Sequence, residues 1–341
     1  MHALLSFVYA YPLVALVVVF ALLFDFLNGF HDAANSIATI VVSKTLTPLQ
    51  AVILAGLANF VGFFTFGLAV AHMVGKGVVH VDVVTLPLIL ATLTGAILWN
   101  IATWLLGLPT SSSHALIGGL IGAAVTHAGF GAVNWGWNGV LKIFCFIIIA
   151  PALGMLAAGA VTTFTIWLFR KSTPAKSRKT FKILQLVSAI FSSIGHGTND
   201  AQKTMGIITL ALMTAGLKKT FEIPSWVVLS AYSAISLGTV FGGWRIVKTM
   251  GANITKIREM EGFCSGTASA VVLLGTAHFG IPVSTTHVIA GSIMGVGAVE
   301  RAGSVRWITA RKIVWAWIIT IPLTASCSAL TYFILTRLIL R

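Results

Sequence analysis

The stretch Gly-Phe-His-Asp-Ala-Ala-Asn-Ser at positions 29–36 returns in altered form as Gly-Thr-Asn-Asp-Ala-Gln-Lys-Thr at positions 197–204. A second stretch, Leu-Pro-Thr-Ser-Ser-Ser-His at 108–114, returns as Ile-Pro-Val-Ser-Thr-Thr-His at 281–287. The first pair is separated by 168 residues and the second by 173. Because two independent motifs repeat at nearly the same distance, the chain is predicted to be a duplication of one unit.

The composition excludes a water-soluble globular protein. Of the 341 residues, 57% are apolar and only 9% are charged, and the mean hydropathy is +0.97. Ordinary soluble domains carry about 25% charged residues. Apolar runs long enough to cross a bilayer recur along nearly the whole chain, so we predict a polytopic membrane protein with lipid around most of its surface.

The charge balance is strongly basic, with 22 Lys and Arg against 8 Asp and Glu and a net charge of +14. In a soluble protein this excess would suggest nucleic-acid binding. Here most basic residues lie in short segments between apolar runs, where they orient a membrane protein. We therefore expect no nucleic-acid partner. Three widely spaced cysteines match no metal or disulfide pattern: Cys145, Cys264 and Cys327.

Each repeat contains five apolar segments, an odd number, so the second copy is expected to enter the membrane from the opposite side. We predict a first inverted repeat at 1–169, a basic cytoplasmic linker at 170–182 with six Lys or Arg and no acid, and a second inverted repeat at 183–341. This orientation places the N-terminus outside the cell. The segments are at about 8–42, 48–72, 85–106, 109–127, 139–169, 184–216, 225–250, 262–279, 281–298 and 311–336.

Two kinds of irregular segment are expected. The first and sixth segments are too long for one regular span and contain polar, glycine-bearing stretches at 28–35 and 195–204, which predict helix breaks inside a protein-lined cavity. The segments at 109–127 and 281–298 open with proline and hydroxyl residues and are predicted to be re-entrant or hairpin elements, crossing or folding back. The predicted fold is therefore an all-α polytopic membrane protein built from two inverted-topology repeats with broken helices and hairpin segments.

Acidic residues inside the apolar segments are the first candidates for a functional site. Only Asp25, Asp32 and Asp200 lie there, and the last two are repeat equivalents. An ionised carboxylate in a bilayer is costly unless it is paired or hydrated. We therefore predict functional roles for Asp32 and Asp200, whereas for Asp25 a structural and a functional role stay open.

Each of these two aspartates begins a polar helical face that continues three and four positions later. The residues on these faces are Asn35, Ser36, Lys203 and Thr204. Lys203 is the main asymmetry, since its repeat equivalent is the neutral Asn35. At membrane depth it must pair with an aspartate, contact an anionic substrate or lose its proton.

Two hydroxyl clusters each follow a proline and precede an apolar helix, the order expected of a capped helix N-terminus. The clusters are Ser111, Ser112 and Ser113, and Ser284, Thr285 and Thr286. Two such N-termini with six hydroxyls predict a cradle for a tetrahedral oxyanion. The alternative is that the hydroxyls only cap helices or allow close packing. We also consider His31 and His196 as proton carriers, against the alternative of packed, hydrogen-bonded histidines.

These motifs resemble those of the inorganic phosphate transporter (PiT) family, which has a Gly-x-Asn-Asp-x-x-Asn-like and a Pro-x-Ser-[Ser/Thr]-[Ser/Thr]-His-like motif in each inverted repeat. The resemblance covers essentially the whole chain. It implies a symporter that takes up inorganic phosphate, and often a homodimer. It also implies binding positions at Asp32, Asn35, Asn199, Asp200, Ser111, Ser112, Ser113, Ser284, Thr285 and Thr286. Among these, Asp32, Asp200, Asn35 and Asn199 are expected to hold the coupling ion or a metal, and Lys203 to join the hydroxyls at the substrate.

Two departures from the sodium-coupled pattern favour protons as the coupling ion. His31 and Lys203 each stand where asparagine is usual, and an ammonium group at a ligand position would occupy a sodium site or repel the ion. These variants resemble the bacterial low-affinity branch, which implies proton coupling, an inner-membrane location and transport of phosphate as a neutral complex with a divalent metal. We expect no resident cofactor.

Three other functions are weighed. Sulfate is the alternative anion, because hydroxyls and helix N-termini do not separate it from phosphate, and sodium is the alternative coupling ion. An intramembrane hydrolase is the alternative from a different class, but it needs one nucleophile with one base. Here the hydroxyls come as duplicated triplets, so we expect a transporter and not an enzyme.

Overall fold

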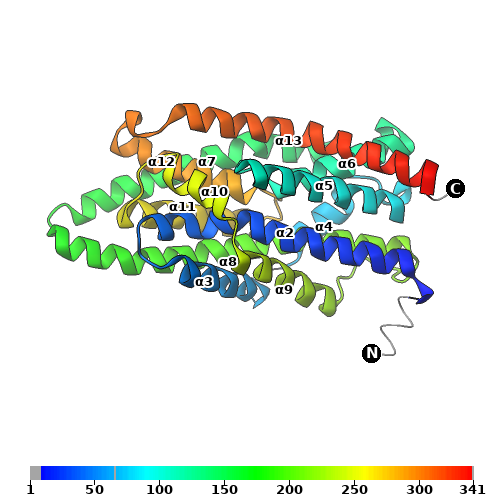
Figure 1. Cartoon of the computed structure of the whole chain (residues 1–341), viewed down its shortest axis with the longest axis horizontal. Helices are drawn as coiled ribbons and strands as arrows, with labels where there is room; N and C mark the ends of the chain where they lie inside the picture. The colour runs from blue at the N-terminus through cyan, green and yellow to red at the C-terminus, as the bar shows by residue number, and fades with distance from the viewer. Residues whose placement is uncertain (1–8, 65–66, 340–341) are drawn as a thin grey trace.

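The computed structural model describes residues 9–64 and 67–339, and most of that part is helical. Figure 1 shows the helices lying roughly along one long axis, with α13 and α7 on one side and α3 and α9 on the other. The ten predicted apolar segments correspond to α2 (Pro12–Val42), α3 (Pro48–Val61) with α4 (Ala69–His72), α5 (Leu86–Leu106), α6 (Ser112–Ala128), α7 (Val140–Phe169), α8 (Pro174–Thr214), α9 (Ser225–Phe241) with α10 (Trp244–Ala252), α11 (Glu259–His278), α12 (Thr285–Glu300) and α13 (Trp307–Ile334).

Several of these helices are long and apolar enough to cross a bilayer. Four meet that standard alone, namely α2, α5, α7 and the helix 307–337 that continues α13, and the number rises to six if each bent helix pair is one span. Large apolar side chains on the outer helices are exposed, such as Ile148 and Leu156 of α7, which are 75% and 72% exposed. Such a surface is stable in lipid and not in water.

The predicted breaks in the first and sixth segments are wrong. Both α2 and α8 run as uninterrupted helices through 28–35 and 195–204. The polar side chains there are buried against neighbouring helices, so the backbone keeps its internal hydrogen bonds. A break occurs instead between α9 and α10, whose axes differ by 73° across Gly242, a residue with a φ of 69°.

The proline-led segments form the second half of two helical hairpins, as predicted. α5 ends at Gly107 and α11 is followed by Gly280, and both glycines have left-handed backbones, with φ of 65° and 63°. Such a residue reverses the chain without the steric cost that a side chain would bring. The chain then passes Pro109 or Pro282 and starts α6 or α12. Each proline lies two residues before the N-cap and not at the first helical position. Figure 1 shows the hairpins in opposite halves of the bundle, α5 and α6 in one and α11 and α12 in the other.

Close helix packing occurs twice, at equivalent positions of the two repeats. A Cβ atom on Gly29 of α2 would lie 2.0 Å from the carbonyl oxygen of Ile235 on α9. A Cβ atom on Gly197 of α8 would lie 2.4 Å from the carbonyl oxygen of Asn59 on α3. Each repeat thus packs its first long helix against the second segment of the other repeat. Small residues allow this backbone contact, which is common between helices in membranes.

The hairpin helices α6 and α12 make similar close backbone contacts with the outer helices α13 and α7. A Cβ atom on Gly122 of α6 would lie 2.1 Å from the carbonyl oxygen of Ala325 on α13, and one on Gly295 of α12 would lie 2.3 Å from that of Met155 on α7. The duplication therefore appears in the packing as well as in the motifs. The repeat boundaries and their opposite orientation in the membrane stay predictions.

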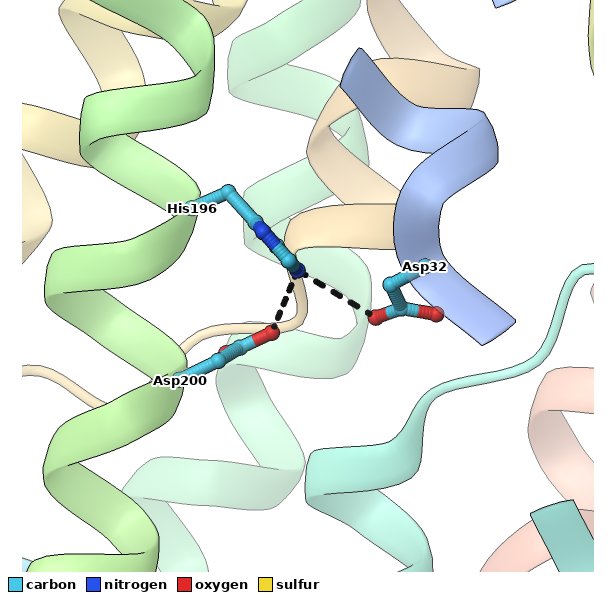
Figure 2. Close-up of side chains that lie close together, drawn as sticks. All are labelled: Asp32, His196 and Asp200. Carbon is cyan, nitrogen blue, oxygen red and sulfur yellow. Dashed lines mark ion pairs between the residues drawn. The ribbon is translucent and has the colours of Figure 1, made fainter. Parts of the chain in front are cut away.

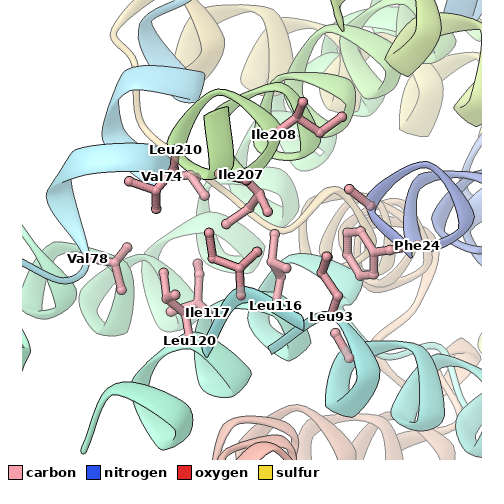
Figure 3. Packing of buried hydrophobic residues seen from close by; sticks show 14 of the residues in the cluster. Phe24, Val74, Val78, Leu93, Leu116, Ile117, Leu120, Ile207, Ile208 and Leu210 are labelled. Carbon is pink, nitrogen blue, oxygen red and sulfur yellow. The ribbon is translucent and has the colours of Figure 1, made fainter. Parts of the chain in front are cut away.

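The largest apolar core lies where α2, α5, α6 and α8 meet. Figure 3 shows Phe24 of α2 beside Leu93 and Leu116, with Ile117 and Ile207 completing the contact between the helices. This core holds α2 against α8, which positions the polar faces that the two helices share. The basic linker contributes to α8 itself, because its residues 174–182 form the first turns of that helix.

Candidate functional site

The duplicated aspartates lie close together between α2 and α8. Asp32 and Asp200 are 3% and 0% exposed, and both face the imidazole of His196. His196 Nε2 lies 3.2 Å from Asp200 Oδ2 and 3.9 Å from Asp32 Oδ2 (Figure 2). The three side chains offer ligand atoms that all lie within 4.8 Å of one another, close enough to share one metal ion.

The hydrogen bond to Asn59 determines which ring nitrogen of His196 carries a proton and which one is left to face the carboxylates. The amide nitrogen of Asn59 donates to Thr239 at 2.8 Å, so the amide oxygen faces His196 Nδ1 at 3.3 Å. That oxygen can only accept, so Nδ1 carries a proton. The other nitrogen, Nε2, therefore either carries a second proton or offers its lone pair to a cation between the aspartates.

The tip of the second hairpin covers the aspartates. Thr285 Oγ1 lies 3.4 Å from Asp32 Oδ2 and 3.2 Å from Asp200 Oδ2, and its hydroxyl can donate to either. The amide nitrogen of Asn35 donates to Thr285 at 3.3 Å and to Thr286 at 3.0 Å. Residues predicted from both repeats are thus connected in one network of hydrogen bonds.

Lys203 connects both hairpin tips to α8. Its ammonium group donates to Asp200 Oδ1, to the hydroxyl of Ser113 in the first hairpin and, at 3.0 Å, to the backbone carbonyl of Val283 in the second. The side chain is 1% exposed. Of the alternatives considered for Lys203, the structure shows pairing with an aspartate, namely Asp200. Asp200 divides its oxygens between Lys203 and the site that it shares with Asp32 and His196.

His31 is held away from the shared cation position. Its Nδ1 lies 2.8 Å from Asp32 Oδ1 and its Nε2 lies 3.1 Å from the hydroxyl of Thr103 on α5. Thr103 in turn donates to the backbone of its own helix at 2.8 Å. The hydroxyl oxygen then accepts from Nε2, so Nε2 carries a proton, and a second proton at Nδ1 would make His31 a cation paired with Asp32.

The hydroxyl clusters divide their roles between capping and the site. Ser111 and Ser284 are the N-caps of α6 and α12 and accept from the backbone of His114 and His287 at 3.1 and 3.3 Å. For these two residues the capping alternative is correct. Ser113, Thr285 and Thr286 face the network, whereas the Ser112 hydroxyl is buried and accepts or donates no hydrogen bond in the structure.

Helix N-termini at the site come from the hairpins, because the expected breaks in α2 and α8 are absent. Because α2 and α8 are continuous near the site, their amide groups are engaged within the helices. Free amide groups and the positive ends of helix dipoles come from α6 and α12 alone. The two N-termini meet at Lys203, so an anion would be bound at the hairpin tips and a cation between the aspartates.

The side chain of Asn199 mainly holds two helices together and contributes one free atom to the site. Its amide nitrogen donates to the backbone carbonyls of Gly195 and Leu273, both at 2.9 Å, which attaches α8 to α11. Its amide oxygen, buried and without a hydrogen bond in the structure, is the atom left for a ligand. His114 and His287, which follow the hydroxyl clusters, pack against each other with ring centroids 4.7 Å apart.

The site is closed to solvent in this conformation. The side chains that build it are all buried: Asp32, Asn35, Ser113, His196, Asp200, Lys203, Thr285 and Thr286. An ion or anion can therefore reach these side chains only through a change in the conformation of the protein. The supporting residues Asn59 and Thr103 were not predicted, although each is a polar residue within an apolar segment, which is a signal that a sequence can give.

Comparison with known proteins gives consistent results. The model of the phosphate transporter family matches residues 28–328. A protein of Rhizobium meliloti named "Probable low-affinity inorganic phosphate transporter" is 51% identical over 95% of this chain and 97% of its own length. A Bacillus subtilis protein of the same name is 45% identical over 96% and 98%.

A solved structure has the same fold. The chain described as the sodium-dependent phosphate transporter superposes with a TM-score of 0.88 at 26% identity, covering 96% of the present chain and all of its own.

Proposed function

Because this chain belongs to the phosphate transporter family, we propose that it is a secondary active symporter that imports inorganic phosphate, coupled to protons, by alternating access. It is a membrane-embedded transporter and not an enzyme. The observation that supports the proposal most is the position of Lys203. Its ammonium group contacts Asp200, Ser113 and the carbonyl of Val283, at the point where both hairpin tips meet.

An anion at this point would have favourable partners. The hydroxyls of Ser113 and Thr286, the free amide groups of two helix N-termini and the Lys203 ammonium group all suit a tetrahedral oxyanion. The two aspartates oppose it, because like charges at close range repel. Phosphate therefore needs a cation or protons between Asp32 and Asp200 when it binds.

A divalent metal is one cation that would meet this need. Two carboxylates and the imidazole of His196 are a ligand set that first-row divalent ions accept, and phosphate oxygens would complete the coordination. We propose that phosphate is carried as its neutral complex with a divalent metal, which lowers the cost of moving the anion through the protein. The metal is cargo in this account and not a resident cofactor.

Sodium is the alternative coupling ion, and the described sodium-dependent structure favours it. In the present chain, however, the Lys203 ammonium group already takes one oxygen of Asp200. Sodium would have to share the aspartate with a fixed positive charge, which weakens its binding. A coupled proton can instead bind to a group outside this ion pair, so the contact supports proton coupling.

Transport of radiolabelled phosphate by the purified protein in liposomes tests the proposal. We expect uptake that unlabelled phosphate suppresses and that equal concentrations of sulfate do not. Suppression by sulfate at the same concentration would contradict phosphate as the substrate. An inner-membrane location, an outward-facing N-terminus and a homodimer stay predictions.

A further inference from the structure

Asp25 is a buried acidic residue that the site described above does not use. It lies on α2 seven residues before Asp32, which is about 10.5 Å along the helix axis and on nearly the same face. Its side chain is 0% exposed, and the adjacent Phe24 belongs to the apolar core in Figure 3. The carboxyl group therefore sits inside the bundle and not in lipid or water.

The carboxyl group lies among polar atoms that make no hydrogen bond of good geometry. Neither oxygen of Asp25 takes part in a hydrogen bond of good geometry, and the amide oxygen of Asn28, one turn further along α2, is buried in the same condition. Thr204 of α8 is the other polar side chain beside Asp25, and its hydroxyl also lacks such a bond. A buried carboxylate whose two oxygens accept no well-formed hydrogen bond is stabilised by adding a proton or a cation.

The charges that face Asp25 do not neutralise it. Asp200 and Lys203 act on it from α8, and Tyr232 faces it from α9. Lys203 already forms an ion pair with Asp200, so the negative charge of Asp200 offsets much of the attraction between Lys203 and Asp25. Two other helices packed on α2, namely α3 and α5, carry no ionisable side chain. An ionised Asp25 would thus be a buried charge without an ion pair of its own in the described part of the chain, which costs several kcal/mol.

We propose that Asp25 is the residue that binds the coupled proton. In the closed conformation its carboxylate takes up one proton, and the resulting O–H group can donate to Asn28 or Thr204. When the bundle opens and water reaches the carboxyl group, the proton leaves. This inference rests on the proposed proton-coupled transport and assigns the proton to a residue outside the phosphate site.

A proton fits this position better than a metal ion. Metal cations bound by oxygens need a shell of several ligands, six or more for calcium and magnesium. The groups identified around Asp25 are one carboxylate, one amide oxygen and one hydroxyl, next to the positive charge of Lys203. A proton needs one lone pair only.

The variant Asp25→Asn tests the proposal because it keeps the shape of the side chain and removes the proton site. Two assays on the purified protein in liposomes separate binding from coupling. Exchange of radiolabelled for unlabelled phosphate needs no gradient, whereas accumulation above equilibrium needs an inward proton gradient. We expect Asp25→Asn to exchange phosphate and to lose accumulation. Asp82→Asn, which changes an exposed aspartate in the short 3-10 helix Val81–Val83, is the matched control and should keep both.

The outcomes distinguish this inference from the proposed function. If the unaltered protein fails to exchange phosphate, the proposed function is wrong. If the unaltered protein accumulates phosphate with a proton gradient and Asp25→Asn does so equally well, the assignment of the proton to Asp25 is wrong. It is equally wrong if the variant loses only accumulation driven by sodium.

A second measurement covers the case in which Asp25→Asn loses its fold. Infrared difference spectra of the unaltered protein, recorded on addition of phosphate, should contain the carbonyl band of a protonated carboxylic acid. In Asp25→Glu, which keeps a proton site, the band should shift in position and accumulation should persist. A band identical in Asp25→Glu would assign the proton elsewhere and overturn the proposal.

Discussion

Lys203 and Asp200, one turn apart on α8, form an ion pair whose side chains are 1% and 0% exposed. The same ammonium group reaches both hairpin tips. A positive charge built into the chain therefore connects α8 to both hairpin tips, and binding of an anion at the tips would have to rearrange these contacts.

Removal of one partner of this pair should cost stability as well as transport. Asp200→Asn leaves Lys203 buried without its carboxylate, which typically costs about 3–5 kcal/mol. We expect no phosphate uptake and a lower melting temperature in detergent. The double variant Asp200→Asn with Lys203→Asn should recover much of the melting temperature without recovering uptake. A double variant less stable than Asp200→Asn alone would contradict the pairing.

Replacement of Lys203 by asparagine should change the response to cations. Lys203→Asn frees Asp200 Oδ1 and supplies a neutral oxygen, so sodium should raise the melting temperature of the variant and leave that of the unaltered protein unchanged. Choline chloride at equal concentration controls for ionic strength, and Lys219→Asn controls for the loss of an exposed lysine. Equal responses in both proteins would mean that Lys203 does not exclude sodium.

The hydroxyl of Thr285 should contribute to binding of the loaded complex. Thr285→Val keeps the shape and removes a donor to a charged acceptor, worth about 1.5–3 kcal/mol. The KM for phosphate should rise by about tenfold or more. Thr163→Val, at an exposed position on α7, is the control and should leave KM unchanged. An unchanged KM in Thr285→Val would mean that the Thr285 hydroxyl does not contribute to binding.

The proposed binding of a metal at His196 can be tested without a transport assay. Cobalt(II) bound to a nitrogen and oxygen ligands absorbs in the visible range, and we expect this absorption when cobalt and phosphate are added together. His196→Gln should abolish it, whereas His80→Gln, a histidine exposed in a loop, should not. Absorption retained in His196→Gln would place the metal elsewhere.

The contact between α2 and α9 should be intolerant of a side chain. Gly29→Ala puts a Cβ atom 2.0 Å from a backbone oxygen of Ile235, so the helices must separate, at a cost of about 1–3 kcal/mol. A lower melting temperature checks this. Gly131→Ala has open space around the added atom and should leave the melting temperature as it is.

The helical segments and the importance of Asp32 and Asp200 could be predicted from the sequence, whereas the local backbone conformation near these residues could not. All ten apolar segments became helices or helix pairs, because burial in lipid depends on length and composition, which a sequence shows directly. Asp32 and Asp200 could be identified as candidates because a carboxylate in an apolar segment needs partners, which here are His31, His196 and Lys203. The expected helix breaks at 28–35 and 195–204 are wrong because side chains on other segments satisfy the polar groups there, and no local pattern reports those partners.

Similar residues have different roles in the structure, and these roles could not be predicted from the sequence. Ser111 and Ser113 are two positions apart, yet one caps a helix and the other contacts Lys203. Asn35 and Asn199 occupy related motifs, yet only Asn35 donates to the second hairpin tip, while Asn199 attaches α8 to α11. Spacing identifies a helical face, but the neighbour that meets that face comes from a distant part of the chain.

The central claim is phosphate uptake coupled to protons, and one measurement tests it most directly. Liposomes that contain the protein are given an inward proton gradient or an inward sodium gradient, each at zero membrane potential, and the accumulation of radiolabelled phosphate is measured. The account predicts accumulation above equilibrium with the proton gradient alone. Accumulation driven by sodium, with none driven by protons, would contradict it.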